Sequence, residues 1–293
     1  MSKINVLGAS CIDILVDHID SKTFLSGKYK TDRVKTSFGG DALNEAVVLS
    51  YLKEDVSIST VIADDPMGVL IQNFLEEKGI TVSNPIKQNV ETYLSLVLID
   101  ENGERHFIGS KNGSLRSYCL EDVCIDEDCK IVSFASMFIS PLFDDEQMVK
   151  LFSLIKEKGI LLCVDCSSIK NNEDAKDMSC LKYIDYFFCN ASEARALCHS
   201  EDIHACEEIL YQCGIKNVVI KMGEKGCLYK GKIYAPQRNI QCVDTTGAGD
   251  SFVAGFIHGL SQNEKIEDCI RIGNECGGRA CEYVGGNEWT THQ

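Results

Sequence analysis

The sequence lacks the features that mark membrane-spanning, secreted and nucleic-acid-binding proteins. No apolar run in the 293 residues reaches the roughly 18 residues that a bilayer span requires, and residues 1–8 contain no long apolar stretch of the signal-peptide kind. No block of Lys and Arg is present either: 29 basic residues stand against 44 acidic ones, a net charge of −15. Because a duplex-binding protein needs a basic face to neutralise phosphates, we expect a cytoplasmic protein that binds neither nucleic acid nor membrane.

Two common nucleotide-binding motifs are also missing. The sequence has no Gly-x4-Gly-Lys-Ser/Thr, which excludes a P-loop NTPase, and no Gly-x-Gly-x-x-Gly after its first strand, which argues against a nicotinamide-dependent oxidoreductase. It also has no proline-rich or low-complexity linker and no internal repeat. We therefore expect one domain over residues 1–293, with extended segments inserted into it, rather than two independent domains.

Cysteine is abundant, with sixteen residues, but the spacing of a metal site is absent. The one Cys-x-x-Cys, Cys163–Cys166, has no second such pair and no pair of histidines to complete a zinc site. As part of a strand it would place Cys163 and Cys166 on opposite faces. We expect most of these cysteines to be reduced, buried packing residues, with a metal or redox role as the alternative.

Apolar runs and amphipathic stretches alternate along the chain and predict repeated strand–helix–strand units. Strands are expected at 4–7, 57–62, 131–135, 160–164, 183–189 and 218–221. Helices are expected at 66–78, at 145–158, from Ser192 onward, and in a further segment that ends near Cys213. Such repeats predict an α/β fold with a central, mostly parallel sheet flanked by helices on both faces.

Two segments do not fit this alternation. Residues 13–37 are polar and strand-like, and residues 91–109 alternate in polarity around an Asn102–Gly103 turn, a hairpin signal. Surface hairpins are one interpretation. The one that we favour is a small β-sheet lid beside the main body, with Asp13 facing the cleft and an apolar side covered by a second lid in a homodimer.

The most informative stretch is 243–252, Val-Asp-Thr-Thr-Gly-Ala-Gly-Asp-Ser-Phe. Small residues at Gly247, Ala248 and Gly249 let a ligand approach the backbone, and they precede an amphipathic helix whose free N–H groups can bind an anion. Asp250 lies in the same turn. It can be a helix cap, or it can be a general base that takes a proton from a hydroxyl attacking the bound anion.

Three further polar stretches lie at expected strand ends or helix starts. In Gly39-Gly40-Asp41-Ala42-Leu43-Asn44, the side chains of Asp41 and Asn44 can face a polyol or simply cap a helix. Asn190 and Glu193 can hold a hydrated magnesium ion or form a capping pair. The third stretch, 221–226, is glycine-rich. Ligands of parallel sheets bind at the carboxyl ends of the strands.

Taken in order, these motifs resemble those of the PfkB (ribokinase-like) carbohydrate kinase family. They are Gly39-Gly40-x3-Asn44, Asn190-x2-Glu193, Gly223-x2-Gly226 and Asp244-Thr245-Thr246-Gly247-Ala248-Gly249-Asp250. The resemblance extends from about residue 4 to about residue 286. It implies a magnesium-dependent transfer of the γ-phosphoryl group of ATP to a hydroxyl of a monosaccharide or related polyol, under a β-sheet lid.

The resemblance also implies a role for each matching residue. Asp250 would be the catalytic base, and Gly247, Ala248 and Gly249 the anion hole. Asp13, Gly39, Gly40, Asp41 and Asn44 would line the sugar site. Asn190, Glu193, Lys221, Gly223, Gly226 and Asn274 would lie around the nucleotide, with Glu193 holding magnesium through water. Asp244 and the carbonyl of Thr246 match a loop that binds a monovalent cation, here potassium.

The sequence departs from the family pattern at several positions. Asp41 and Glu45 are not the commonest residues of their motif, and the segment 166–170 replaces the Asn and Arg of many members. The acceptor sugar is therefore not implied. A nucleoside kinase of the same fold and a non-catalytic sugar-binding relative are the alternatives; the presence of Asp250 argues against the second.

Overall fold

Two β-sheets and a set of helices make up the part of the chain that the structure describes, residues 3–19, 30–31, 34–100, 105–167, 169 and 174–292 of a computed structural model. The strands of the larger sheet are β1 (Lys3–Leu7), β4 (Asp55–Ser59), β5 (Thr81–Val82), β8 (Cys129–Met137), β9 (Leu161–Cys166), β10 (Tyr186–Asn190), β11 (Val218–Lys221), β12 (Cys227–Tyr229) and β13 (Lys232–Tyr234). The smaller sheet contains β2 (Cys11–Ile19), β3 (Val34–Gly39), β6 (Leu94–Asp100) and β7 (Arg105–Gly109). The helices are α2 (Asp41–Tyr51), α3 (Pro66–Glu77), α4 (Asp145–Glu157), α5 (Ala191–Cys198), α6 (Ile203–Gln212), α7 (Ala248–Ser261) and α8 (Ile266–Ala280).

The larger sheet is mostly parallel, as predicted. Its strand order is β13-β12-β11-β10-β9-β8-β1-β4-β5, and every neighbouring pair from β11 to β5 is parallel. Only β12 and β13 run antiparallel to their neighbours, at one edge. The carboxyl ends of the parallel strands therefore meet at one edge of the sheet, where side chains at strand ends come together.

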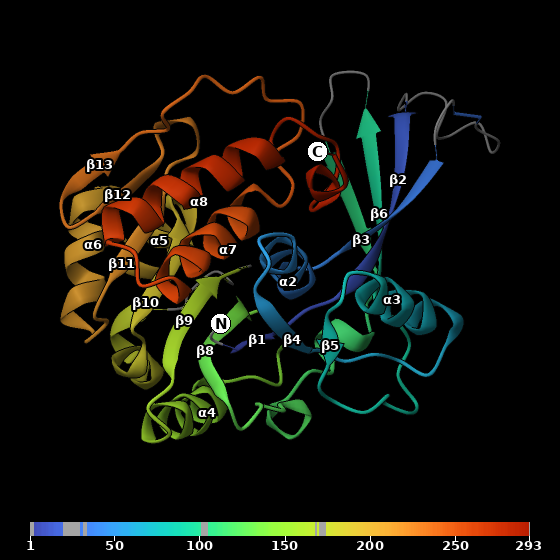
Figure 1. Cartoon of the computed structure of the whole chain (residues 1–293), viewed down its shortest axis with the longest axis horizontal. Helices are drawn as coiled ribbons and strands as arrows, with labels where there is room; N and C mark the ends of the chain where they lie inside the picture. Colours follow the sequence, from blue (N-terminus) through green and yellow to red (C-terminus); the bar gives the residue numbers. More distant parts are fainter. Residues whose placement is uncertain are drawn as a thin grey trace.

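Helices cover both faces of the larger sheet (Figure 1). Helices α2, α3, α7 and α8 pack on one face, and α4, α5 and α6 on the other. Along β9, Leu162, Val164 and Cys166 face the second group while Cys163 faces the first. This confirms the prediction that the two cysteines of the Cys-x-x-Cys lie on opposite faces, and it explains why these strands carry no polar alternation.

The cysteines are mostly packing residues, as expected. Eleven of the sixteen are buried, four are partly exposed and one, Cys242, is exposed; all are free thiols in the structure. Burial is the leading cause that raises the pKa of Cys129 to about 11 and that of Cys227 to about 12. Buried thiols with raised pKa values are poor nucleophiles and poor metal ligands.

The smaller sheet has the strand order β3-β2-β6-β7. β2 runs antiparallel to β3 and parallel to β6, and β6 pairs with β7 as an antiparallel hairpin. In Figure 1 β2, β3 and β6 extend beside the main body, close to α3. Phe38 of β3 stacks on Phe74 of α3 with ring centroids 4.1 Å apart. The predicted turn at Asn102–Gly103 lies outside the described residues, as do residues 20–29 and 32–33.

Two predicted strands are displaced in the structure. The strand predicted at 57–62 is Asp55–Ser59, and the other begins later than predicted. Residues 183–189 were predicted to be extended, but a 3-10 helix occupies Ser179–Tyr183 and the strand is Tyr186–Asn190. Asn190 is therefore the last residue of β10 as well as the residue that caps α5. Within the described residues, no helix is both long enough and apolar enough to cross a membrane.

Candidate functional site

The N-terminus of α7 has no side-chain cap among the described residues, and Gly247 occupies the cap position with φ +70°. The N–H of Ala248 donates to the carbonyl oxygen of Thr245 at 3.2 Å, outside the helix. A Cβ at Gly247 would overlap the carbonyl oxygen of Gly286, so only glycine fits here. The N–H groups of this first turn therefore lack an intrahelical acceptor and can bind an anion.

Asp250 lies in this turn but does not cap the helix. Its Oδ2 accepts a hydrogen bond of 2.7 Å from Nδ2 of Asn44, on α2. The Oδ1 of Asn44 in turn accepts a bond of 2.8 Å from Asn287, which also donates to the carbonyl of Phe38. Burial raises the pKa of Asp250, and the Asn44 hydrogen bond and the Lys221 charge oppose that rise. An oriented, buried carboxylate beside an anion site has the placement of a general base.

Asp13, Gly39, Gly40 and Asp41 lie close together where β2 and β3 meet the start of α2. A Cβ at Gly39 would overlap the carboxylate of Asp13, and one at Gly40, where φ is +96°, would collide with the backbone of Ala9. The Oδ2 of Asp41 accepts a hydrogen bond from Ser167. Burial and then the Asp250 charge raise the pKa of Asp41 well above its usual value. Burial raises the pKa of the nearby Cys11 thiol well above its usual value. The charges of three carboxylates, Asp13, Asp41 and Asp250, raise it further.

A buried ion pair lies close to Asp250. Nζ of Lys221, at the end of β11, donates to both carboxylate oxygens of Asp165, at 2.7 and 2.8 Å. The same ammonium would lie 3.1 Å from a Cβ at Gly249, so it sits directly under the first turn of α7. Burial raises the pKa of Asp165 to about 7 although Lys221 opposes the rise. Sequence reasoning gave no role to Asp165, Ser167 or Asn287.

Asn190 and Glu193 form a reciprocal capping box at the start of α5. The N–H of Glu193 donates to Oδ1 of Asn190 at 2.9 Å, and the N–H of Asn190 donates to Oε2 of Glu193 at 2.7 Å. In the structure this pair therefore forms the capping arrangement. Burial raises the pKa of Glu193, and the Lys221 charge opposes this, which places Glu193 in the same electrostatic field as the ion pair.

The glycine-rich turn and α8 lie together beyond β11. Gly223 and Gly226 have φ of +60° and +84°, and a Cβ at Gly226 would overlap the carbonyl of Tyr234. Nδ2 of Asn274, on α8, donates to that same Tyr234 carbonyl at 3.1 Å. Two of the residues predicted for the nucleotide side, Gly226 and Asn274, thus meet at one backbone carbonyl, whereas Gly223 has open space around the position of a Cβ.

The predicted cation loop is packed against the last turn of the described chain. Oδ1 of buried Asp244 accepts a bond of 2.9 Å from the N–H of Thr246, and Oδ2 accepts one of 2.8 Å from the N–H of Gly285. Both oxygens of Asp244 therefore shape the turn that leads into Gly247. Within the described residues, no three His, Cys, Asp or Glu side chains converge as a ready-made metal site.

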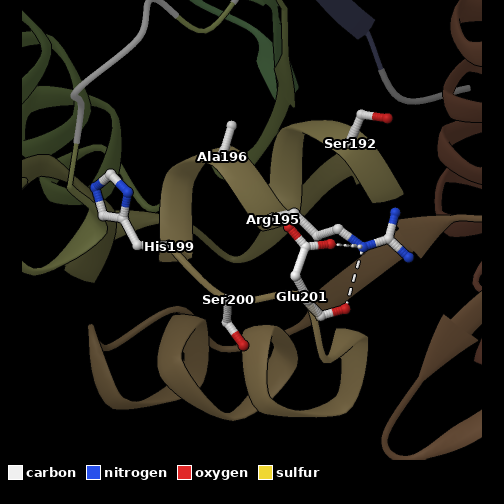
Figure 2. A pocket seen from close by; sticks show the side chains of 6 residues that line it. All are labelled: Ser192, Arg195, Ala196, His199, Ser200 and Glu201. Carbon is white, nitrogen blue, oxygen red and sulfur yellow. Dashed lines mark hydrogen bonds and ion pairs between the residues drawn. The ribbon is translucent and has the colours of Figure 1, made fainter.

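A hollow on α5 lies outside this set of residues. Figure 2 shows it between α5 and the segment that follows, with Arg195 turned toward Glu201; Nε of Arg195 donates to the Glu201 carbonyl at 3.2 Å. None of the side chains that line it was predicted from the sequence, and its one cation is already paired with Glu201. It is not the site that the motifs form.

The comparisons with known proteins agree with this geometry. Residues 1–292 match the family model described as pfkB family carbohydrate kinase. The chain belongs to this family. It is 25% identical to the 2-dehydro-3-deoxygluconokinase of Haemophilus influenzae, over 85% of this chain and 87% of that protein. An adenosine kinase of Sinorhizobium meliloti has the same fold, with a TM-score of 0.83, 21% identity and coverage of 99% and 98%. The ribokinase of Arabidopsis thaliana, solved with ribose and ATP, has a TM-score of 0.81, 20% identity and coverage of 99% and 96%.

The family assignment confirms the ribokinase-like fold and makes the chain a phosphotransferase with an alcohol acceptor. Kinases of this family use ATP, with Mg²⁺ implied. The residue roles stay predictions, and what the structure adds is their placement. Asp13, Asp41, Asn44, Asp165, Lys221 and Asp250 form a connected set at the carboxyl edge of the larger sheet.

Burial of several carboxyl groups around Lys221 predicts an unusual dependence of stability on pH. The pKa values of Asp41, Glu45, Asp165, Glu193 and Asp250 are all raised, with burial as the leading cause. The folded state then holds more protons than the unfolded state between about pH 4 and pH 7. The free energy of unfolding of the ligand-free protein should therefore fall as pH rises, by up to about 1.4 kcal/mol per pH unit for each such group.

Glu45 provides the cleanest test of this pH dependence. It is fully buried, Ser133 donates to its Oε2 at 2.5 Å, and its Oε1 has no hydrogen-bond partner among the described residues. Glu45→Gln should flatten the fall measured by urea unfolding between pH 5 and 7. Glu146→Gln, in an exposed pair with Lys150, is the control and should leave it unchanged. Stability that rises over this range in the wild type would contradict the prediction.

Proposed function

We propose that the chain is an ATP-dependent sugar kinase, which transfers the γ-phosphoryl group to a hydroxyl of a monosaccharide or related polyol. The observation that carries the proposal is the position of Asp250. It lies in the uncapped first turn of α7, held by Asn44, with the acidic side chains of Asp13 and Asp41 on one side and Lys221 on the other. A hydroxyl placed between Asp250 and a phosphoryl group at the helix N-terminus could lose its proton to Asp250 and attack the phosphorus atom.

The proposed roles follow from this arrangement. Asp250 takes the proton from the acceptor hydroxyl as that oxygen attacks phosphorus. The N–H groups of Gly247, Ala248 and Gly249, with the Lys221 ammonium beneath them, stabilise the charge on the transferring group. Burial, which raises the pKa of Asp250, makes this carboxylate a stronger base than an exposed one.

On the nucleotide side we propose that Asn190, Glu193, Gly223, Gly226 and Asn274 surround ATP. Because the described residues hold no preformed metal cluster, Mg²⁺ would bind together with the phosphates and keep part of its water shell. The Glu193 carboxylate could accept hydrogen bonds from these waters. Bound there, Mg²⁺ supplies charge neutralisation between the phosphates. The raised pKa of Glu193 fits this role, because burial leaves its carboxylate short of counter-charge.

The acceptor class separates this proposal from its alternatives. The fold is shared with an adenosine kinase, so a nucleoside is the second candidate, but three acidic side chains around the acceptor side favour a hydroxyl-rich sugar or polyol. A panel of sugars, polyols and nucleosides with MgATP, read out as ADP release, decides between them. A sugar or polyol should give the highest kcat/KM. Turnover of nucleosides alone would replace the proposal with its second candidate, and binding of sugars without turnover would make the chain a non-catalytic relative.

The smaller sheet is proposed to be a lid over the acceptor site and a homodimer interface. It carries Asp13 on β2, and its outer strands expose apolar side chains: Val34 is 65% exposed, Phe107 66% and Ile108 53%. Because Phe107 and Ile108 are consecutive on β7, they point to opposite faces of the sheet, and pairing of two lids through the face that carries Phe107 would cover that side chain. We expect a dimer at micromolar concentration by analytical ultracentrifugation and a shift toward monomer in Phe107→Lys. Leu154→Lys, an exposed apolar position on α4, is the control. A wild-type monomer at these concentrations would contradict the proposal.

The Asp244–Thr246 loop is proposed to hold potassium. Its backbone turn is fixed at both ends by Asp244 and joins directly to the anion-binding Gly247. A bound cation would order this turn without touching ATP. Replacing sodium by potassium at constant ionic strength should therefore raise kcat, whereas equal rates in the two salts would count against the loop as a cation site.

We also propose a cytoplasmic location, which the sixteen free thiols favour.

A further inference from the structure

Two thiols far apart in the sequence, Cys242 and Cys281, lie against each other next to the Asp244 turn. Burial raises the pKa of the Cys281 thiol, and the Cys242 thiol is one of the neighbours that raise it further. The backbone holds them there, because the N–H groups of Val243 and Asp244 both donate to the carbonyl oxygen of Cys281, at 2.7 and 3.1 Å. The segment before Cys242 also contacts α8, because Ile240 packs against Gly278.

Access distinguishes this pair from the other close cysteines of the protein. Cys242 is the exposed cysteine of the chain and Cys281 is partly exposed. Cys198 and Cys206 are also in contact, with Sγ of Cys198 donating to the Cys206 carbonyl at 3.6 Å, but both are buried. Contact alone is therefore not unusual here. Only Cys242 and Cys281 combine contact with a path for a reagent.

We propose that Cys242 and Cys281 are a site of reversible oxidation that forms an intramolecular disulfide by exchange with a low-molecular-weight disulfide. The Cys242 thiolate attacks one sulfur of the small disulfide, whose S–S bond breaks and releases one small thiolate. The Cys281 thiolate then attacks Sγ of Cys242 in the mixed disulfide and releases the second small thiolate. The two protein thiols are oxidised, the small disulfide is reduced to two thiols, and the two protons pass to the released thiolates.

The order of these steps follows from the surroundings of each sulfur. Cys281 is only partly exposed, so a reagent in solution reaches it less readily. Cys242 is exposed and meets the reagent first. Once Cys242 carries the mixed disulfide, Cys281 is already beside it and closes the bond without a long chain movement.

The disulfide would join the segment before the Asp244 turn to the end of α8 and would enclose all of α7 and α8. It would fix the backbone that leads into Gly247 in the arrangement that the Val243 and Asp244 hydrogen bonds already hold. A cross-link that closes a loop of this length stabilises a protein mainly by restricting its unfolded chain. The expected result is a rise in the melting temperature of roughly 5 °C or more.

The test is a titration of the whole protein with oxidised glutathione, followed by alkylation of free thiols, non-reducing peptide mapping and a thermal melt. We expect one cross-linked peptide pair that contains Cys242 and Cys281, alkylation of Cys198 and Cys206 after unfolding, and the rise in melting temperature, all reversed by reductant. Cys242→Ser and Cys281→Ser should lose both the cross-link and the rise. Cys124→Ser removes a partly exposed thiol elsewhere and should keep both.

Either of two results would overturn the proposal. One is a glutathione adduct that stays on Cys242 at millimolar oxidised glutathione, because Cys281 then fails to resolve it. The other is a cross-link between any other pair of cysteines. Peptide mapping of the wild type distinguishes these results without any variant, so the conclusion does not depend on how the serine variants fold, and none of the readouts requires kinase activity.

Discussion

Asp250→Asn is expected to lower kcat by about 10² to 10⁴, the usual contribution of a general base, while acceptor binding is nearly retained. The amide keeps the shape of the side chain and can still bond to Asn44, whose amide group donates to Oδ2 of Asp250 in the structure. It cannot accept the proton of the acceptor hydroxyl. The measurement is kcat with saturating acceptor, together with acceptor affinity from calorimetry.

Asp202→Asn is the matched control, because Asp202 is an aspartate that caps a helix. Its Oδ1 accepts a bond of 2.9 Å from the N–H of His204 at the start of α6, and its loss should leave kcat unchanged. If Asp250→Asn retains turnover within tenfold of the wild type, Asp250 has only a structural role and the mechanism proposed above is wrong.

Lys221→Met should produce the second large effect, a loss of about 10² to 10³ in kcat, comparable to removal of one group that stabilises the transition state. Lys221 is the mostly buried cation beneath the first turn of α7, and both oxygens of Asp165 hold it in place. Asp165→Asn keeps the ammonium but weakens its anchor. It should therefore reduce kcat less than Lys221→Met does and raise the KM for ATP.

Lys216→Met provides the comparison for this pair. Lys216 precedes β11 and pairs with Asp185 at 2.8 Å, but its side chain is 59% exposed and lies away from the site. We expect kcat to be unchanged there. If Lys221→Met keeps kcat within fivefold of the wild type while the fold is intact by circular dichroism, Lys221 does not act on the transferring group.

The parts of the site that could be predicted from the sequence are those whose residues are close together along the chain. The Gly-Ala-Gly-Asp turn at 247–250 and the pair at 190 and 193 are complete local patterns, and the structure places them at helix starts as predicted. The alternation of strands and helices likewise predicted the mostly parallel sheet, because each element carries its own periodicity.

The residues that were missed act through partners distant in sequence. Asp165 and Lys221 are 56 positions apart, and Asn44 and Asn287 are 243 apart. An aspartate at the end of an apolar strand gives no local signal of the lysine that will pair with it. Cys242 and Cys281 were missed for the same reason, since the sequence shows only their spacing.

The burial of Glu45 could not be predicted for a different reason. The sequence marks Glu45 only as an uncommon residue of its motif, and an amphipathic helix should have one polar face that can hold a glutamate. In the structure every residue from Ala42 to Leu49 is buried, because α2 packs against α7, β4 and β8 together. Burial on all sides turns a surface residue type into a buried acid, and the sequence of α2 alone does not contain that information.

The central claim is that this chain moves the γ-phosphoryl group of ATP to an alcohol. The most direct measurement is phosphorus-31 NMR of a reaction with MgATP and the preferred acceptor from the panel. We expect a phosphomonoester signal on the acceptor that grows in step with ADP, with little free phosphate, and its loss in Asp250→Asn. ADP that forms only together with inorganic phosphate, whatever acceptor is present, would contradict the account.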